Sequence, residues 1–448
     1  MKTNLSARLR VGYASGGMAT GSFGTVPGLL LLPYLTDSLG IGSAIAGLIV
    51  FLPKAWDVIL NPITGRLSDR VSSAGGTRRP FLLWGGIALA VSFALLFSGP
   101  HAPEGLAGAW VIVAFLMCAT AYSAFQVPYV ALPAELTDDY AERTRLLTWR
   151  VAILAFAILA SGATAPLIRN AVGGAAGYRA MAIFVAVLIL AGALGAYAGT
   201  RGILTTAVAS PAGGLPAQLG MTWRVRDFRL LLITFVVQAL AIGSMLAGVD
   251  YVARMALHNP DASSILFACF VGPALLVTPL WQRTAARLGK KRGYLLSSLV
   301  LAGSAAGLLA AGTAPVLVVY ALAAIAGIGY AGCQLFPLAM LPDTAAHEAR
   351  LSNENRIGVF TGVWTAGETL GLALGPVIFA LILSIGGYRS STVGGRAQPG
   401  SAITAITVGF SVLPALLIMI SLVALRGYAL TAQDLRTDMV PRDEDVQR

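Results

Sequence analysis

The chain has 448 residues, of which 56% are hydrophobic and 11% are charged. Soluble proteins carry about a quarter charged residues, so this composition excludes an ordinary soluble domain. The net charge of +11 comes from basic residues that cluster in short loops between apolar runs. It therefore indicates membrane topology and no nucleic-acid partner.

The sequence lacks the common signatures of enzymes. Its three cysteines lie far apart within apolar runs, and its three histidines lie near the ends of such runs without metal-ligand spacing. It contains no phosphate-binding loop, no GxSxG and no HExxH. We therefore expect no enzyme, no metal and no cofactor, and an ATP-driven pump is disfavoured.

Twelve apolar runs are long enough to cross a bilayer, which takes about 20 helical residues. We expect an all-α polytopic membrane protein with helices near 11–35, 41–64, 80–99, 108–133, 146–168, 178–199, 228–253, 262–284, 293–312, 315–340, 356–385 and 403–426.

The spans fall into two groups of six. Residues 200–227 are polar and rich in proline and glycine, which is typical of a connecting loop. The predicted organisation is one bundle over 1–199, a cytoplasmic loop over 200–227, a second bundle over 228–426 and a charged cytoplasmic tail over 427–448.

Lysine and arginine are concentrated in alternate loops. This asymmetry places both termini in the cytoplasm, because cytoplasmic loops carry an excess of basic residues. We expect a multi-pass protein of the cytoplasmic membrane, surrounded by lipid and monomeric, with a small-molecule substrate.

The two halves resemble each other. AYSAFQVPYVALPAEL at 121–136 is matched by GYAGCQLFPLAMLPDT at 329–344, which pairs Tyr122 with Tyr330 and Gln126 with Gln334. The second and eighth spans are each followed by a basic turn. Two duplicated six-helix bundles are a known transporter plan, with the substrate site near midplane between them.

The second span carries Lys54, Asp57 and Asn61, which share one helical face because they lie three and four residues apart. Charged groups in hydrocarbon cost several kcal/mol and usually mark function. The cluster indicates a site for a proton, a cation or a polar substrate, and Pro62 frees backbone carbonyls beside it. The alternative is an internal ion pair that locks two helices.

Arg150 enters an apolar run beside Trp149, where it needs a carboxylate, a carbonyl or an anionic substrate. The charges around 135–145, including Glu135 and Glu142, are expected to be solvated. Asp250 and Arg254 lie four residues apart near the outer end of the seventh span. They form either an outside gate or a plain surface pair.

The eleventh span carries glycines at positions 358, 362, 367, 371 and 375. Small residues at this spacing predict close helix packing. Trp364 and Glu368 share a face of the same span, and a ring with a carboxylate one turn away suits a polyol or a cation.

Two sets of motifs resemble known families. The turn GRLSDR at 65–70 with Arg78-Arg79 resembles the loop between the second and third helices of the major facilitator superfamily. WDVILNP, RTRLLTWR and GVWTAGETLGLALGP, with Leu35-Thr36-Asp37, resemble the glycoside–pentoside–hexuronide:cation symporter family, typified by melibiose permease. The gating motif implied by this resemblance comprises Gly65, Asp69, Arg70, Arg78 and Arg79.

The resemblance also implies site residues. The family's sodium motif in the second helix, Asp-x-x-Asn-Asp-Pro, reads Asp57-Val58-Ile59-Leu60-Asn61-Pro62, so the second carboxylate is an amide. At an effective dielectric constant of about 20, one charge about 4 Å away contributes roughly 4 kcal/mol, which disfavours sodium coupling of the family type. A sugar-contacting acid falls on Gln126, a family arginine matches Arg150, and a family Glu-Lys pair reads Glu368-Thr369.

We expect a secondary transporter that moves a sugar or glycoside by alternating access, coupled to H⁺ rather than Na⁺. An amphipathic or lysolipid-like solute, uncoupled facilitation or export, and a non-transporting membrane sensor or assembly factor are the alternatives. The candidates for ion coupling are Lys54, Asp57, Asn61 and Glu368, and those for substrate binding are Tyr122, Gln126, Trp149, Arg150, Tyr330, Gln334, Trp364 and Thr369.

Overall fold

The structure is a computed structural model that describes residues 6–73, 77–137, 139–201, 220, 222–352, 357–391 and 397–430. These residues form helices and contain no strand. The α-helices are α1 (Ala7–Pro33), α2 (Ser43–Ser73), α3 (Arg79–Leu96), α4 (Glu104–Leu136), α5 (Tyr140–Val172), α6 (Gly174–Gly199), α8 (Arg226–Tyr251), α9 (Ala262–Leu276), α10 (Thr278–Leu288), α11 (Lys290–Gly307), α12 (Val316–Ser352), α13 (Ile357–Ile385), α14 (Gly400–Phe410) and α15 (Val412–Arg426). Short π-helical turns follow α1 (η1, Tyr34–Ser38) and α8 (η2, Val252–Ala256), and a 3-10 turn follows α11 (η3, Leu308–Gly312).

The number of spans agrees with the sequence pattern. In the described part of the chain, 11 helical segments are long and apolar enough to cross a membrane, or 12 if one bent pair counts as a single span. The predicted all-α membrane architecture is therefore confirmed. Several helices extend past their apolar runs, because helical hydrogen bonding continues where the chain leaves the hydrocarbon.

The bent pair is the predicted eighth span, which consists of α9 and α10 at an angle of 53°. The break falls at Val277, just before Thr278-Pro279. Proline has no N–H to donate and disfavours helical geometry in the preceding residue. Pro279 therefore explains why one apolar run forms two helices.

The residues form two compact units. Unit 1 comprises Met1–Ser210, Gly243–Ala268 and Ala373–Phe410, and unit 2 comprises Pro211–Ile242, Cys269–Leu372 and Ser411–Arg448. The second-half segments 243–268 and 373–410 thus pack with the first half. Most of the predicted connecting loop and the tail beyond residue 430 lie outside the described residues, so the predicted domain boundaries stay a prediction.

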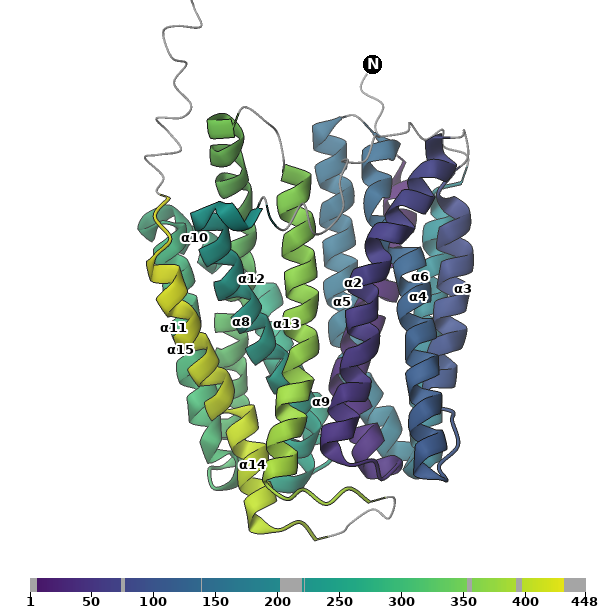
Figure 1. Ribbon diagram of the computed structural model, residues 1–448, viewed down its shortest axis with the longest axis vertical. Coiled ribbons are helices and arrows are strands. Elements are labelled where there is room, and N and C mark those ends of the chain that lie inside the picture. Colours follow the sequence, from purple (N-terminus) through teal and green to yellow (C-terminus); the bar gives the residue numbers. More distant parts are fainter. Residues whose placement is uncertain are drawn as a thin grey trace, which may run out of the picture. The chain divides into compact units, whose positions relative to one another are not determined.

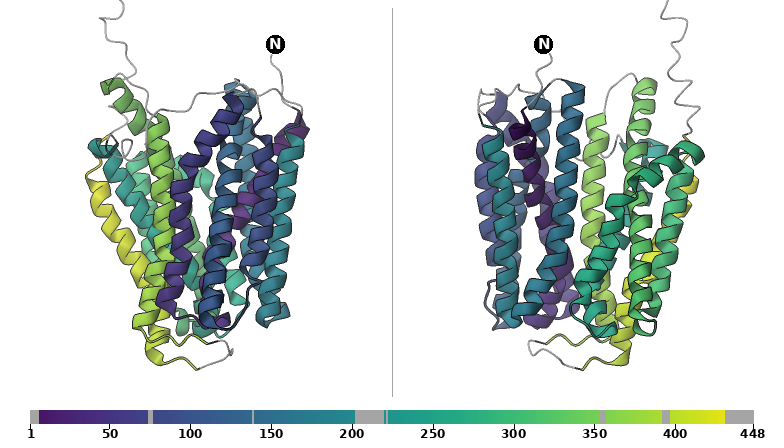
Figure 2. Two further views of the ribbon diagram at one scale, coloured as in Figure 1. Left: turned by 45° about the vertical axis from the view of Figure 1, so that its right-hand side comes forward. Right: turned by 180° about the vertical axis from the view of Figure 1, so that it is seen from behind.

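In unit 1, α1 packs against α5 and α6, α3 packs against α4 and α6, and α2 packs against α4. The helices α2 to α6 run side by side in Figure 1, and the views of Figure 2 show the same bundle in purple and blue. The turn between α5 and α6 consists of Gly173 and Gly174, both with positive φ. Glycine adopts this conformation without steric cost, so the chain reverses within two residues.

In unit 2, α11 packs against α12 and α15, and α10 packs against α11 and α12. Its core contains aromatic residues from several helices, including Phe235, Tyr294, Phe336, Phe360 and Trp364.

The predicted duplication recurs in the contacts. In unit 1, Arg78 precedes α3 and its Nε lies 2.8 Å from Oε1 of Glu135 near the end of α4. In unit 2, Lys290 at the start of α11 pairs with Asp343 on α12 at 2.5 Å. Each half therefore joins the basic start of one helix to an acid near the end of the next. The expectation that Glu135 is solvated is wrong, because its side chain is 1% exposed and paired.

The basic residues that come next in sequence, Arg79 after Arg78 and Lys291 after Lys290, also make equivalent contacts in the two halves. Arg79 donates to the carbonyl of Tyr197 on α6 at 3.0 Å. Lys291 donates to the carbonyls of Arg426 and Tyr428, at the end of α15, at 3.0 and 2.7 Å. These two contacts in equivalent positions support duplication of an ancestral half.

The expectation that Glu142 is solvated is also wrong, because Glu142 is 4% exposed and pairs with Arg145 at 3.0 Å. It lies in the first turn of α5, where the positive end of the helix dipole favours an acid.

The glycines of α13 have the predicted packing role at some positions. A Cβ on Gly371 would lie 2.7 Å from the carbonyl oxygen of Val236 on α8, and a Cβ on Gly375 would meet the backbone at Ser244. A Cβ on Gly362 would meet nothing within 4 Å. Close contact between α8 and α13 therefore depends on the later glycines.

We predict that Gly371→Ala lowers the melting temperature of the detergent-solubilised protein, because overpacking costs about 1–3 kcal/mol. Gly362→Ala is the matched control in the same helix. It should leave the melting temperature unchanged or raise it, since alanine has the higher helix propensity by about 1 kcal/mol. Equal effects of the two substitutions would contradict this account of the α8–α13 contact.

Candidate functional site

The ionisable cluster of α2 lies within unit 1. Asp57 is 6% exposed, and its carboxylate interacts with the ammonium of Lys54 and with the side chain of Asn61. The three residues therefore meet as their spacing predicts. The Lys54 ammonium also lies over the ring of Phe23, 5.1 Å from its centroid.

The next contacts lead to α4. Phe23 packs against Tyr122, with ring centroids 4.6 Å apart. Gln126 lies one turn further along α4, followed by Tyr129, and residues spaced four and three apart share a helical face. This face of α4 thus continues from the Lys54 cluster towards α5.

Arg150 on α5 lies at the other end of this face. Its guanidinium lies over the ring of Tyr129, 5.2 Å from the centroid. Tyr129 donates to the carbonyl of Tyr13 at 2.9 Å and stacks on that tyrosine. The arginine is thus held by aromatic rings. Trp149 is 49% exposed, so its predicted role in substrate binding stays untested.

Four buried polar atoms of α2, α4 and α5 in this region have no hydrogen-bond partner among the described residues, and the hydroxyl of Tyr13 on α1 is a fifth. The four are Oδ1 of Asp57, Oδ1 of Asn61, Oε1 of Gln126 and Nε of Arg150. Buried polar groups are nearly always paired, because an unpaired one costs about 1–3 kcal/mol. Three of the four atoms are acceptors, so this region favours a ligand that donates hydrogen bonds.

Unit 2 holds the second group of candidates. Gln334 on α12 interacts with Glu368 on α13 and with the phenol of Tyr330. Tyr330 stacks on Phe270 of α9, with centroids 5.1 Å apart. These residues form a small polar cluster on three helices, and the predicted group of Tyr330, Gln334 and Glu368 is brought together.

Two other candidates on α13 have local roles. Trp364 is 2% exposed and stacks on Phe235 at 4.3 Å, so it belongs to the core of unit 2. Thr369 donates to the carbonyl of Thr365 at 3.0 Å, within its own helix. Their substrate contacts stay predictions.

The basic turn after α2 is held by Arg78. This residue is 4% exposed and pairs with both Asp69 and Glu135. Gly65 and Arg70, which were predicted to lie in this turn, instead lie within α2, because the helix continues to Ser73. Arg70 is exposed, and Gly65 lies opposite Val127 of α4, where a Cβ would be in ordinary contact at 3.7 Å. The turn therefore links the ends of α2, α3 and α4.

A second ionic cluster lies at the other end of unit 1, and we call it the ion network. It consists of Asp37 in η1, Arg169 in α5, Asp250 in α8 and Arg254 in η2. Asp250 is fully buried and accepts from Arg169 at 2.7 Å and from Arg254 at 2.8 Å. Arg254 also pairs with Asp37 at 2.5 Å. Two cations, of which Arg169 is buried and Arg254 partly exposed, and two anions thus compensate one another.

Neutral groups complete the ion network. Tyr388, after α13, donates to Asp37 at 2.7 Å. Burial and the neighbouring Asp37 carboxylate raise the pKa of Tyr388, so its phenol stays protonated. Thr36 and Tyr251 share a hydrogen bond of 2.7 Å beside it. A polar pocket of about 700 Å³ opens next to these residues.

Sequence reasoning found only part of the ion network. The spacing of Asp250 and Arg254 indicated a pair, but burial of Asp250 excludes the plain surface pair. The predicted fifth span ends at residue 168, so Arg169 falls outside it, whereas the structure places Arg169 within α5; Asp37 enters the sequence analysis only as part of a family motif. Their meeting could not be found, because no local pattern relates positions 37, 169 and 250.

The α2 cluster offers carboxylate and amide oxygens, the donor type that hard cations such as Na⁺ use. Its single carboxylate already has the Lys54 ammonium as an electrostatic neighbour, however, although no salt bridge joins the two. An added cation would therefore bring uncompensated charge into a buried site. In the described residues, no group of three or more His, Cys, Asp or Glu could hold a metal ion.

Comparison with known proteins agrees with this architecture. The glucuronide carrier protein homolog of Escherichia coli is 27% identical over 456 residues, with 99% of this chain and 97% of that protein covered. The isoprimeverose transporter of Lactiplantibacillus pentosus is 25% identical, with 91% and 85% covered. A solved structure of a proton-dependent oligopeptide transporter has a TM-score of 0.68 at 17% identity, with 98% of this chain and 100% of that chain covered. This likeness supports the fold alone.

A family model described as MFS/sugar transport protein matches residues 12–432. The match covers nearly the whole chain, as the resemblance in its motifs implied, and the family consists of transporters rather than enzymes. The chain therefore belongs to the MFS/sugar transport family of the major facilitator superfamily.

Proposed function

We propose that this protein is a secondary transporter that moves a sugar or glycoside across the membrane by alternating access. The observation that carries the proposal is the set of four unpartnered buried atoms on Asp57, Asn61, Gln126 and Arg150. Three are acceptors, and a sugar presents several hydroxyl donors. The names of the two relatives, a glucuronide carrier homolog and an isoprimeverose transporter, support the same class of solute.

Aromatic rings line the same face of α4. Tyr122 and Tyr129 lie on either side of Gln126 in the sequence. Such rings present an apolar surface next to polar groups, which suits a sugar ring with its apolar C–H faces and polar edges. The guanidinium of Arg150 adds a donor for a hydroxyl or carboxylate oxygen.

The proposed coupling ion is a proton. The Lys54 ammonium opposes the charge of the one carboxylate in the α2 cluster, and Asn61 adds no charge. A proton needs only a titratable group, whereas a sodium ion needs a site with net negative charge. Asp57 is the group proposed to bind that proton.

We also propose that the ion network closes one end of the transport path. It joins segments of the first half, at positions 37 and 169, to segments of the second half, at positions 250–254 and 388. By the predicted orientation this end faces outwards. Alternating access requires contacts between the halves to form and break. The charged groups of the ion network can become hydrated when these contacts break.

The proposed substrate class can be tested by thermal shift. A bound glycoside at 100 times its Kd should stabilise the folded protein by about 2.7 kcal/mol. Gln126→Ala should weaken binding about fivefold, since a lost hydrogen bond costs roughly 1 kcal/mol. Gln282→Ala, on the exposed surface of α10, is the matched control. Stabilisation by lysolipids but by no sugar or glycoside would refute the substrate class.

The proposed coupling can be tested in proteoliposomes. Asp57→Asn should abolish uptake against a gradient when a pH gradient is imposed, while exchange of labelled solute at equal concentrations continues. Asn61→Asp adds a second carboxylate, so its uptake should become responsive to sodium. Unchanged accumulation by Asp57→Asn, or sodium-driven accumulation by the wild type, would rule out the proton-binding role of Asp57.

The gating role can be tested by hydrogen exchange. The double variant Asp37→Asn with Arg254→Gln keeps the net charge but removes the ion pair. Backbone amides of 34–39 and 252–257 should then exchange at least about tenfold faster, which corresponds to about 1.4 kcal/mol of local opening. The control is Glu142→Gln with Arg145→Gln, at the other end of α5. Unchanged exchange in both segments would show that the network does not hold this end closed.

A further inference from the structure

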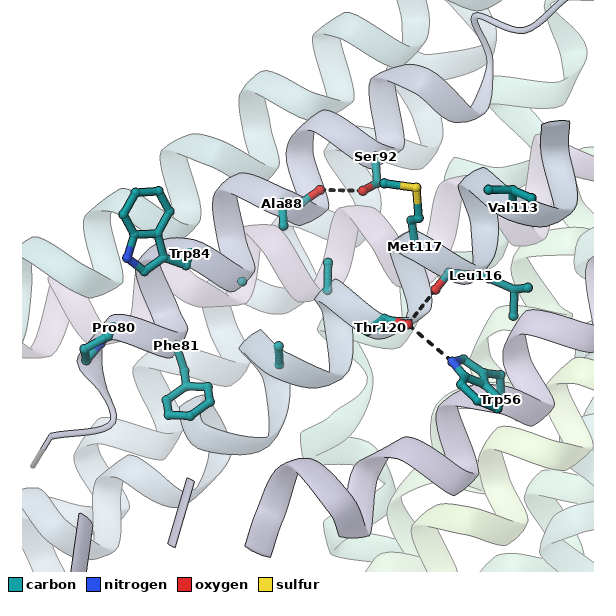
Figure 3. A pocket seen from close by; sticks show the side chains of 13 residues that line it. Trp56, Pro80, Phe81, Trp84, Ala88, Ser92, Val113, Leu116, Met117 and Thr120 are labelled. Atoms are coloured by element: carbon teal, nitrogen blue, oxygen red, sulfur yellow. Dashed lines mark hydrogen bonds between the residues drawn. The ribbon is translucent and has the colours of Figure 1, made fainter. Parts of the chain in front are cut away.

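A second cavity lies on the membrane-facing side of unit 1, away from the polar clusters. It is a groove of about 820 Å³ between α2, α3 and α4 (Figure 3). Its walls carry large apolar side chains, and alanine and glycine occupy the positions between them. The lining residues are Trp56, Pro80, Phe81, Trp84, Gly85, Ala88, Ser92, Val113, Leu116, Met117, Thr120, Ala121 and Ala124.

The side-chain polar groups of this lining, except for one exposed indole, are already satisfied within the protein. Ser92 donates to the carbonyl of Ala88 at 2.6 Å, and Thr120 donates to that of Leu116 at 2.8 Å. The Nε1 of Trp56 donates to the Thr120 hydroxyl at 3.3 Å, and Figure 3 shows these three bonds. The groove therefore offers almost nothing to a polar solute, in contrast to the region around Gln126. Its chemistry fits a hydrocarbon chain.

The length of the groove matches one leaflet. Its lining on α3 runs from Pro80 to Ser92, which is about 18 Å at 1.5 Å per residue. Half of the hydrocarbon core of a bilayer is about 15 Å. One end of the groove lies at Pro80, beside the basic turn that precedes α3, and the other lies at Ser92, four residues before the end of α3. A lipid tail from the leaflet on the side of that turn has the matching length.

Charge at the basic end selects the headgroup. Trp56, Ile63, Leu67 and Arg70 share one face of α2, and all four are exposed. This face leads from the groove wall to the arginine at the membrane surface. Trp84, 68% exposed, lies near the same end, as tryptophans do at membrane interfaces. A single arginine near the surface attracts an anionic headgroup by about 1 kcal/mol.

We propose that the groove is a binding site for an anionic phospholipid, with one acyl chain between α2, α3 and α4 and the headgroup beside Arg70. The lipid is a bound structural component and is not the transported solute. The site lies outside the proposed transport path, so the inference does not depend on the substrate of the transporter.

The test is native mass spectrometry of the detergent-purified, delipidated full chain, titrated with dioleoyl phosphatidylglycerol or dioleoyl phosphatidylcholine. Wild type should bind one phosphatidylglycerol at least about fivefold more tightly than phosphatidylcholine, the factor that corresponds to ~1 kcal/mol. Arg70→Gln should remove this preference. Arg287→Gln, which replaces an exposed arginine near the end of α10 in unit 2, should keep it.

Occupation of the groove itself is tested by Ala88→Phe. Ala88 is exposed in the groove, so a ring there fills the space without disturbing the helix core. The variant should lose at least about tenfold in affinity for phosphatidylglycerol, and Ala191→Phe, on the exposed face of α6, should bind like wild type.

Location is tested by quenching. Phosphatidylglycerol with 9,10-dibrominated chains should quench tryptophan fluorescence saturably, and the double variant Trp56→Phe with Trp84→Phe, which removes both groove tryptophans, should lose most of that saturable component. Equal binding by Ala88→Phe and Ala191→Phe, or a headgroup preference that survives Arg70→Gln, would overturn the proposal. Loss of glycoside binding without loss of phosphatidylglycerol binding would count against the proposed transport function alone.

Discussion

The need to compensate every ionised group within the membrane shapes this structure more than any other constraint. Hydrocarbon offers no hydrogen bonds, so an unpaired charge there costs several kcal/mol. Asp250 illustrates the consequence, because it is fully buried and bound by both Arg169 and Arg254. Lys54 and Asp57 likewise place opposite charges near each other on one face of α2, without a salt bridge. Each ionic cluster thereby fixes the helices that supply its members.

This constraint also explains how the duplicated halves stay recognisable. Arg78 with Glu135 and Lys290 with Asp343 occupy equivalent positions, although the residue types differ. The pair is retained because the start of one helix and the end of the next must meet there, and because either partner alone would be a partly buried, uncompensated charge. Arg78 meets that need with two acids, Asp69 and Glu135, and Lys290 meets it with Asp343 alone.

The apolar groove of unit 1 and the polar region around Gln126 differ in one physical property, which is whether their polar atoms have hydrogen-bond partners. Oε1 of Gln126 is buried and unpaired, whereas the hydroxyls of Ser92 and Thr120 in the apolar groove are bonded to their own helices. The first arrangement favours a hydrogen-bonding solute, and the second favours a lipid chain. In the pocket beside the ion network, the charges of Asp37 and Arg254 compensate each other. This pairing fits the proposed closure of the transport path better than it fits a substrate-binding site.

The sequence by itself determined the membrane class, the positions of the helices and the family, because apolar run length, basic loops and short motifs are local properties. It also indicated the Lys54–Asp57–Asn61 face, since helical periodicity alone brings those residues together. Tertiary structure decided the rest. It brought Arg169 to Asp250 and Asp37 to Arg254, and it buried Glu135 against Arg78. It also placed Trp364 in the core of unit 2. These outcomes depend on which helices pack together, and no spacing along the chain encodes that.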